Sequence, residues 1–400
     1  MDHISTDADF MHEPLEWAEI PAPTGGYLLA PDDMPDGTLG GLVTGQVGRL
    51  CDAAGLGPAD ARGYADTIVE ALGAPAGRPL ILPPAAPTFL SDDHTPLEYS
   101  LSFTPDRAPV LRVLLDPGCG TGGLAESGRA GLDFVRRAAR RWNFSTTRLD
   151  DLADLFLPPD PEGPLALWCA LELRPGGVPK VKVYLNPAAK GAKRSAETVR
   201  EALRRLGHRH AFDALPPGDR FLFFALDLGD WDDPRAKVYL AHQDVRAEDA
   251  AALSRTADAA GRTGLRDFFH AVTGADRHPD GEAALLRRPF QSCHAFTRTA
   301  SCRPTGFTLY VPVRDHARHD GEALERAVTV LEHHGIDPRP LVRGVTAVTG
   351  RRLTDGVGLL SYVSLAHQRG RPPRVTVYLS AEAYRVRPPN LPAAQPEAVH

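Results

Sequence analysis

Several features that define other classes of protein are scarce or missing in this 400-residue sequence. Its five cysteines are scattered without a C-x-x-C pair, so neither a disulfide framework nor a zinc site is indicated. The first residues lack the basic and apolar regions of a signal peptide, and no run approaches the ~18 apolar residues of a membrane span. The net charge of −6 argues against a protein that coats nucleic acid or an anionic membrane. We therefore expect a reduced, cytoplasmic enzyme.

Lysine is also scarce, since only five of the 45 basic residues are lysines, so a lysine at a repeated position is informative. Four segments share one pattern: K-V-K-V-Y-L-N-P from Lys180, R-A-K-V-Y-L-A-H from Arg235, G-F-T-L-Y-V-P-V from Gly306 and R-V-T-V-Y-L-S-A from Arg374. A fifth, V-L-R-V-L-L-D-P from Val110, has leucine in place of the tyrosine. Alignment gives one column of Arg112, Lys182, Lys237, Thr308 and Thr376, and a second of Leu114, Tyr184, Tyr239, Tyr310 and Tyr378. Such a repeat indicates a recurring supersecondary unit.

Each repeated segment has the alternation and the β-branched or aromatic residues of a strand. Each also follows another strand-like run across turn-rich sequence such as R-P-G-G-V-P. These preceding runs lie at residues 97–103, 167–173, 221–228, 293–298 and 359–365. Helical periodicity lies between the pairs, at residues 130–142, 196–206, 248–260 and 322–333. The pattern predicts five β-hairpins, and therefore ten antiparallel strands.

The predicted fold is α+β, a ten-stranded antiparallel β-barrel surrounded by α-helices and built from five ααββ repeats. Closure into a barrel buries one face of ten strands under a single helical layer and leaves an interior wide enough for ligands. A flat sheet with helices on one face is the alternative that the spacing leaves open. We expect one domain over residues 1–400, with an N-terminal extension at about 1–25 and a C-terminal tail at about 386–400.

The repeated columns also predict chemistry, because residues two apart on a strand point the same way. In a closed barrel the cations Arg112, Lys182, Arg235 and Lys237 converge with the tyrosines. No matching column of acidic residues is evident, so we expect an anionic ligand such as a diphosphate to neutralise these buried cations. Tyrosine faces stabilise carbocations and exclude water. The combination predicts ionisation of an allylic diphosphate, and a barrel that only carries a ligand is the non-catalytic alternative.

The hairpin repeat, the K-x-Y and R-x-K-x-Y-L motifs and the L-E-Y-S of the first hairpin resemble the dimethylallyltryptophan synthase family of aromatic prenyltransferases. Members of this family fold as the ABBA or PT barrel. The similarity spans about residues 87–379, and the length and arginine-rich composition resemble the bacterial members. The resemblance implies a diphosphate site of Arg112, Lys182, Arg235, Lys237 and Thr308, the last standing where fungal members often carry glutamine. It implies a carbocation shield of Tyr184, Tyr239, Tyr310, Tyr362 and Tyr378. It implies tryptophan binding by Phe89, Leu90, Glu98 and, as a weaker match, Arg220.

The activity that this resemblance implies is transfer of a dimethylallyl group from dimethylallyl diphosphate to the indole ring of L-tryptophan. C6 is the favoured ring position, with C5, C7 and C4 open, as is another indole or aromatic acceptor. Glu98, Lys182 and Arg235 would be catalytic, with Glu98 accepting the indole N–H. No metal or cofactor is expected to be required, with magnesium at most stimulatory. Two departures stand out: residues 167–173 lack the lysine that is a candidate base in some relatives, and Arg369, Arg371 and Arg374 are all candidates to meet phosphate.

Two short motifs point to other chemistry. V-L-L-D-P-G-C-G-T-G-G-L from Val113 resembles the glycine loop of S-adenosylmethionine-dependent methyltransferases, which is the alternative activity. That loop needs a second parallel strand ending in an acidic residue, whereas residues 132–137 are helical in character. Residues 150–154 spell the D-D-x-x-D of all-helical isoprenoid synthases, which bind magnesium-diphosphate. Those enzymes need a second acidic cluster, which this hairpin-rich chain lacks.

Overall fold

The computed structural model describes residues 37–229, 231, 235–243, 245–274, 288–297, 303–368 and 370–390. The expected N-terminal extension at 1–25 lies outside these residues, as do residues 391–400 of the expected tail. The first residues of that tail are packed, since Asn390 donates hydrogen bonds to the carbonyl oxygens of Arg314 (2.9 Å) and Ala317 (2.7 Å). No helix in the described part of the chain is both long enough and apolar enough to cross a bilayer.

Ten strands form five antiparallel hairpins, as the sequence predicts. Their bounds are β1 (Leu97–Phe103), β2 (Val110–Leu115), β3 (Leu167–Glu172), β4 (Lys180–Leu185), β5 (Arg220–Leu228), β6 (Ala236–His242), β7 (Phe290–Phe296), β8 (Gly306–Val311), β9 (Leu360–Gln368) and β10 (Arg374–Ser380). The strands follow chain order around the sheet, and β1 then pairs with β10 from Glu98↔Ser380 to Phe103↔Val375. This last pairing closes the barrel, which confirms the predicted fold and excludes the flat sheet.

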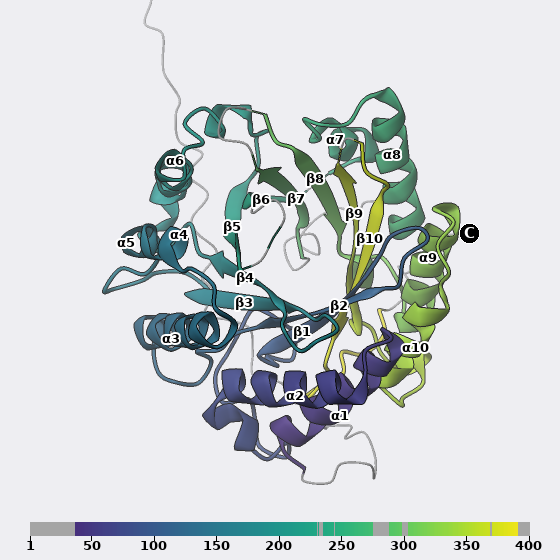
Figure 1. The fold of residues 1–400 in the computed structure, drawn as a ribbon. Coiled ribbons are helices and arrows are strands. Elements are labelled where there is room, and N and C mark those ends of the chain that lie inside the picture. Colours follow the sequence, from purple (N-terminus) through teal and green to yellow (C-terminus); the bar gives the residue numbers. More distant parts are fainter. Residues whose placement is uncertain are drawn as a thin grey trace, which may run out of the picture.

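The helices lie around the outside of the barrel (Figure 1). They are α1 (Leu39–Ala53), α2 (Pro58–Leu72), α3 (Leu124–Trp142), α4 (Thr147–Asp150), α5 (Ala153–Phe156), α6 (Ser195–Arg205), α7 (Ala247–Ala252), α8 (Ala259–Thr273), α9 (Asp320–His333) and α10 (Arg339–Val348). The first, fourth and fifth hairpins each follow a helix pair. The ααββ repeat is therefore not uniform, because three helices precede the second hairpin and one α-helix, α6, precedes the third among the described residues.

The helix predicted over residues 248–260 is wrong, because the chain breaks between α7 and α8. Ser254 and Asp258 cause this break. The Ser254 hydroxyl accepts a hydrogen bond from the backbone N–H of Ala257 (3.0 Å), and Asp258 caps α8 by accepting from the N–H of Gly261 (2.9 Å). Serine and aspartate side chains compete in this way with the helical hydrogen bonds and favour a new N-terminus.

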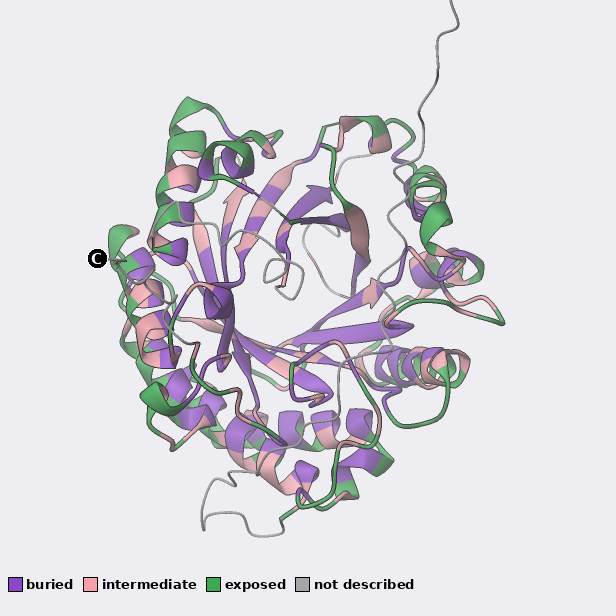
Figure 2. Ribbon diagram, turned by 180° about the vertical axis from the view of Figure 1, so that it is seen from behind, coloured by how far each residue is buried: buried purple, intermediate pink, exposed green. Residues whose placement is uncertain are grey.

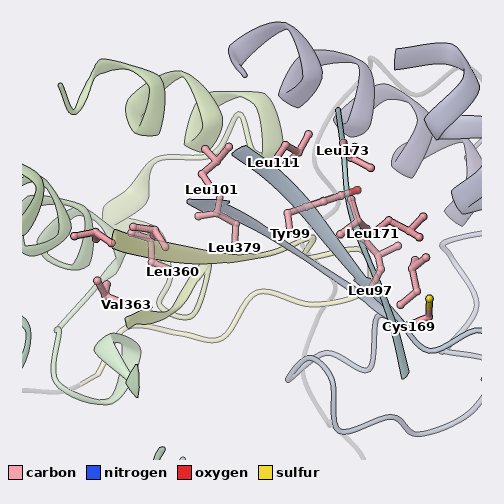
Figure 3. Packing of buried hydrophobic residues seen from close by; sticks show 14 of the residues in the cluster. Leu97, Tyr99, Leu101, Leu111, Cys169, Leu171, Leu173, Leu360, Val363 and Leu379 are labelled. Atoms are coloured by element: carbon pink, nitrogen blue, oxygen red, sulfur yellow. The ribbon is translucent and has the colours of Figure 1, made fainter. Parts of the chain in front are cut away.

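The main hydrophobic core lies between the barrel and its helices, where the outward face of each strand is apolar. Leu97, Tyr99 and Leu101 of β1 point into this layer with Leu111 and Leu379 of the neighbouring strands (Figure 3). The buried Tyr99 hydroxyl donates to the side-chain oxygen of Gln46 on α1 at 3.0 Å, which ties the helix to the sheet. The strands are mostly buried, while exposed residues gather on the outer helices and loops (Figure 2). The inward face of the strands is therefore available for polar and aromatic side chains.

The two other motifs lie away from the barrel interior. Strand β2 is antiparallel to both β1 and β3, so the glycine-rich segment after it lacks the parallel-sheet context of a methyltransferase. The aspartates of D-D-x-x-D lie around α4 and α5, where Asp150 pairs with Arg136 (2.7 Å) and Asp154 with Arg205. No group of three or more candidate metal ligands occurs among the residues that the structure describes. Surface arginines neutralise these aspartates.

Candidate active site

A cavity of about 760 Å³, which includes space open to solvent, enters the barrel at one end. Eight of the predicted site residues line it, namely Phe89, Leu90, Glu98, Tyr184, Tyr239, Tyr310, Tyr362 and Tyr378. Residues 89–92 come from the loop before β1, and the tyrosines come from β4, β6, β8, β9 and β10. The structure therefore gathers into one cavity residues that lie nearly 300 positions apart in the sequence.

Aromatic rings form a continuous belt around this cavity. The ring centroids of Tyr184 and Tyr239 are 5.7 Å apart, those of Tyr239 and Tyr310 5.9 Å, and those of Tyr310 and Tyr378 5.8 Å. Trp168 and Phe223 extend the belt, with centroids 5.4 Å apart. We call these six residues the aromatic belt. Sequence reasoning missed Trp168 and Phe223, although cross-strand register places them opposite Tyr184 and Tyr239, respectively.

Five cations lie in the barrel interior beside the aromatic belt. We call them the cation cluster: Arg112, Lys182, Arg235, Lys237 and Arg374. Lys182 and Lys237 lie two residues before Tyr184 and Tyr239 on the same inward faces, as predicted from the repeat. The Lys182 ammonium is 6.0 Å from the centre of the Tyr184 ring. The belt and the cluster are thus adjacent. The belt residues line the cavity, and the cations of the cluster are not among the lining residues.

The expectation that these cations lack acidic partners is wrong. Arg112 pairs with Glu172 at 2.8 Å, and Asp227 pairs with both Arg235 (2.6 Å) and Lys182 (3.6 Å). Burial raises the pKa of Asp227, but the neighbouring cations lower it to about 2. Both acids stand near the ends of strands that precede the lysine–tyrosine segments, opposite Arg112 and Lys182 in register. Aligning the preceding strands as well would have revealed them.

In the part of the chain that the structure describes, the cluster nevertheless keeps an excess of positive charge, because two carboxylates face five cations. Lys237 shows the effect most strongly. Burial lowers its pKa well below the ordinary value, and the charges of Arg235 and Lys182 lower it further. A buried excess of like charge is costly unless an anion enters. The cluster is therefore suited to a multiply charged anion such as a diphosphate.

Arg374 belongs to the cation cluster. Of the three arginines that could meet phosphate, Arg369, Arg371 and Arg374, it is therefore the one that the structure places among the other cations. Its side chain is close to Arg112, Arg235, Tyr310 and Tyr378, and burial lowers its pKa to about 10. Its Nε atom is buried without a hydrogen-bond partner in the described part of the protein. Arg371 follows the end of β9, and Arg369 lies outside the described residues. Thr308 lies beside Cys293 and Ala366 in register on β8, away from the cavity lining.

Glu98 lies in the cavity wall at the start of β1. The hydroxyl group of Ser361 donates a 2.6 Å hydrogen bond to its carboxylate. Burial raises the pKa of Glu98 to about 7, against the opposing effects of Ser361 and Arg288. The carboxylate therefore changes its charge near neutral pH and faces the same space as the aromatic belt.

The mouth of the cavity carries two arginines that sequence reasoning missed, Arg288 and Arg314. Arg288 donates to the carbonyl oxygen of Phe89 (3.0 Å) and to Asp92 (2.8 Å). Arg314 also pairs with Asp92. Arg220, which the resemblance implied for tryptophan binding, begins β5 opposite Ala241 and is not among the residues that line the cavity. Burial lowers the pKa of Arg220, while Tyr362 and Asp219 oppose that shift. No repeat marks Arg288 or Arg314, so the motifs gave no signal for them.

A family model described as tryptophan dimethylallyltransferase matches residues 61–340. The chain belongs to this family. The crystal structure of PriB with product diphosphate is 60% identical, with a TM-score of 0.85, over 88% of this chain and 98% of that one. The 5-dimethylallyltryptophan synthase from Streptomyces coelicolor is 59% identical, with a TM-score of 0.84, over 88% of this chain and all of that one. The 6-dimethylallyltryptophan synthase from Micromonospora olivasterospora, in complex with DMASPP and Trp, is 38% identical, with a TM-score of 0.79, over 88% of this chain and 99% of that one.

Membership of the tryptophan dimethylallyltransferase family agrees with the resemblance drawn from the repeats, and with the ten-stranded barrel. It makes the chain a prenyltransferase and removes the methyltransferase alternative. The matched region contains the cavity residues from β1 to β8, whereas Tyr362, Arg374 and Tyr378 lie beyond residue 340.

Proposed function

We propose that this chain transfers the dimethylallyl group of dimethylallyl diphosphate to the indole ring of L-tryptophan. The observation that carries the proposal is the position of an aromatic belt directly beside a cation cluster with excess positive charge, in a member of this family. Three relatives have been crystallised with ligands of this kind: PriB and the 5- and 6-dimethylallyltryptophan synthases, each with tryptophan and a dimethylallyl thiolodiphosphate.

The donor's diphosphate would bind the cation cluster, with Thr308 nearby. As the carbon–oxygen bond of the donor breaks, negative charge grows on the leaving diphosphate, and fixed cations stabilise that charge most in the transition state. Lys182 and Arg235 would act in this way, held by Asp227. The allyl cation would then lie against the tyrosines Tyr184, Tyr239, Tyr310, Tyr362 and Tyr378, whose faces stabilise it and exclude water.

The indole would lie between the belt and Glu98, with its N–H donated to the carboxylate. A charge-assisted bond of this kind becomes stronger as positive charge spreads into the ring, so it favours the transition state. Phe89 and Leu90, in the loop at the cavity mouth, and Arg220 would hold the amino-acid end. A ring carbon attacks the allyl cation and a carbon–carbon bond forms. A base then removes the proton from that carbon, and the electrons of the broken C–H bond restore the aromatic ring.

We propose C6 as the carbon that is alkylated, on the resemblance to bacterial members of the family. The 59% identical relative is named for C5 and the 38% identical one for C6, so both positions are represented among similar proteins. We further propose that the reaction needs no metal or cofactor and takes place in the cytoplasm, where thiols stay reduced. The four described cysteines are buried and free.

Product analysis tests the proposal. Tryptophan, a tryptophan-containing dipeptide and a simple phenol are each incubated with dimethylallyl diphosphate, and the products are analysed by mass spectrometry and NMR. We expect one dimethylallyl group on tryptophan, at C6, and much slower reaction of the other two acceptors. Preference for the dipeptide or the phenol would overturn the acceptor, whereas a C5 product would overturn the ring position only.

A further inference from the structure

Trp231 is an aromatic residue that belongs to neither the belt nor the repeated motifs. It lies in the connection between β5 and β6, and its indole is fixed by two hydrogen bonds. Its Nε1–H group donates to the carbonyl oxygen of Leu228 (2.8 Å) and to that of Val181 (3.0 Å). These carbonyls belong to β5 and β4, so the ring is held across the two strands that carry Asp227 and Lys182.

The fixed ring is close to three cations. The ammonium group of Lys180 is 4.8 Å from the ring centre, the guanidinium carbon of Arg235 5.0 Å and the ammonium group of Lys182 5.4 Å. All three distances lie within the ~6 Å range in which the quadrupole of an indole attracts a cation. Lys182 and Arg235 are the two cations that also share Asp227. Their charged ends therefore lie between one carboxylate and one aromatic ring.

The chemistry of an indole suits this position better than a third carboxylate would. Among the described residues the five cations of the cluster have two carboxylate partners, Glu172 and Asp227, and their like charges repel one another. Another carboxylate would reduce that repulsion but would also repel an incoming diphosphate. A ring face attracts the cations without carrying a net charge, so their positive field toward the cavity is preserved.

We infer that Trp231 is a positioning residue that holds Lys182 and Arg235 in the arrangement that binds the donor's diphosphate. This inference rests on the proposed function, because it assigns the diphosphate to the cation cluster. Trp231 is not expected to contact tryptophan, since the cavity mouth and Glu98 lie among other residues. Its effect should therefore be specific to the donor.

The test uses three variants of the full chain. Trp231→Leu removes the ring, Trp231→Phe keeps a weaker ring face but loses both hydrogen bonds, and Trp142→Leu is the matched control. Trp142 ends α3 outside the barrel, where the guanidinium carbon of Arg141 is 6.0 Å from its ring. Calorimetry measures the affinity for inorganic diphosphate, and steady-state kinetics give KM for dimethylallyl diphosphate and for tryptophan.

We expect Trp231→Leu to weaken diphosphate binding and to raise the donor KM about tenfold, and Trp231→Phe to do so about threefold. The KM for tryptophan should stay within about twofold in both, and Trp142→Leu should match wild type. Diphosphate affinity within twofold of wild type in Trp231→Phe would overturn the inference, as would equal loss of affinity for both substrates. If Trp231→Leu does not fold, the Phe variant decides alone.

Failure of the proposed function gives a different result. In that case the wild-type protein itself does not alkylate tryptophan, while the binding of inorganic diphosphate can still be measured in every variant. A donor-specific loss in the Trp231 variants of an active enzyme supports both conclusions. An active wild-type enzyme whose diphosphate affinity is unaffected by either Trp231 variant contradicts only the role of Trp231.

Discussion

In the proposed mechanism, Glu98 is the residue whose charge acts on the acceptor. Glu98→Gln keeps the shape of the side chain and removes the negative charge that would accept the indole N–H. A hydrogen bond to a charged group contributes about 1.5–3 kcal/mol, so we expect kcat to fall roughly 10- to 100-fold. Inorganic diphosphate should bind the variant as it binds wild type, because the cation cluster lies on other strands. A variant with wild-type kcat on tryptophan would remove Glu98 from the mechanism.

The same residue predicts a pH dependence. Because burial raises the pKa of Glu98 to about 7, the carboxylate is largely protonated at pH 6 and ionised at pH 8. In the proposed mechanism the ionised carboxylate accepts the indole N–H, so kcat/KM for tryptophan should rise as pH increases through about 7 and then level off. This rise should be absent in Glu98→Gln. A flat profile between pH 6 and 8 in the wild-type enzyme would contradict the assignment.

Lys182 predicts the effect of a single charge on ionisation of the donor. Lys182→Ala removes a cation from beside the leaving group and should lower kcat/KM for dimethylallyl diphosphate about 10- to 100-fold, and Arg235→Ala should act similarly. The exposed Lys193 gives a control, since Lys193→Ala removes the same charge at the surface. A kcat/KM for Lys182→Ala within about twofold of wild type would contradict the assigned role.

At this scale the repeat predicted that four tyrosines and the cations of β2, β4 and β6 lie together, because residues repeated at one strand position must share one environment, whereas Phe89, Leu90, Glu98 and Tyr362 were expected from the family resemblance. It failed for residues that occur once. Asp227 and Glu172 each serve particular cations, and Arg374, although it lies within a repeat, could not be separated from two nearby arginines. Arg288 reaches the cavity mouth from just before β7. Local spacing carries no information about such contacts, which depend on the closed barrel.

At the scale of elements, strands β6 and β7 are joined by a buried polar group on their outward faces. The hydroxyl group of Ser292 lies 2.8 Å from Nε2 of His242 and 3.0 Å from Nε2 of His294. A hydroxyl has one proton to donate, so one histidine accepts from Ser292 and the other donates to it. Burial lowers the pKa of both histidines, that of His294 to about 3. The group is therefore neutral in the folded protein.

This arrangement predicts that acid destabilises the barrel. The unfolded chain takes up a proton at His294 below its ordinary pKa of ~6.5, but the folded protein does not until pH ~3, so stability is lost as pH falls between these values. From pH 7 to pH 5 the loss should be about 2 kcal/mol for this residue. His294→Gln should flatten the pH dependence of denaturant midpoints, whereas His333→Gln, at an exposed position, should not. Parallel curves for wild type and His294→Gln would contradict this prediction.

The elements themselves were predicted well where one signal dominated. All five hairpins were found because strand alternation and turn chemistry agreed, and α9 was placed to within two residues. The failure was the helix over 248–260, where apolar periodicity continued across a short segment with its own capping residues. The hydrogen bonds of Ser254 and Asp258 break the helix in that segment, and the spacing of apolar residues carries no information about these bonds.

At the scale of the whole molecule, closure of the barrel depends on the pairing of β1 with β10, whose partners Glu98 and Ser380 lie far apart in the sequence. No local pattern specifies such a pairing, which is why spacing alone left a flat sheet open. Closure also determines the electrostatics. The chain has a net charge of −6, yet among the described residues the cation cluster brings together five cations whose carboxylate partners are Glu172 and Asp227. The fold thus separates a local excess of positive charge, among the described residues of the barrel interior, from the negative net charge of the chain as a whole.

This separation predicts that the reaction does not depend on a metal ion. Magnesium serves other diphosphate enzymes by neutralising the leaving group, and in the proposed mechanism the cation cluster would supply that charge. Turnover in excess EDTA should stay within about twofold of turnover in magnesium. Asp150→Asn with Asp154→Asn should also leave it unchanged, because these aspartates pair with surface arginines. If turnover is lost in EDTA and returns only with magnesium, and if the double variant is inactive, then the aspartate motif and not the cation cluster carries the diphosphate.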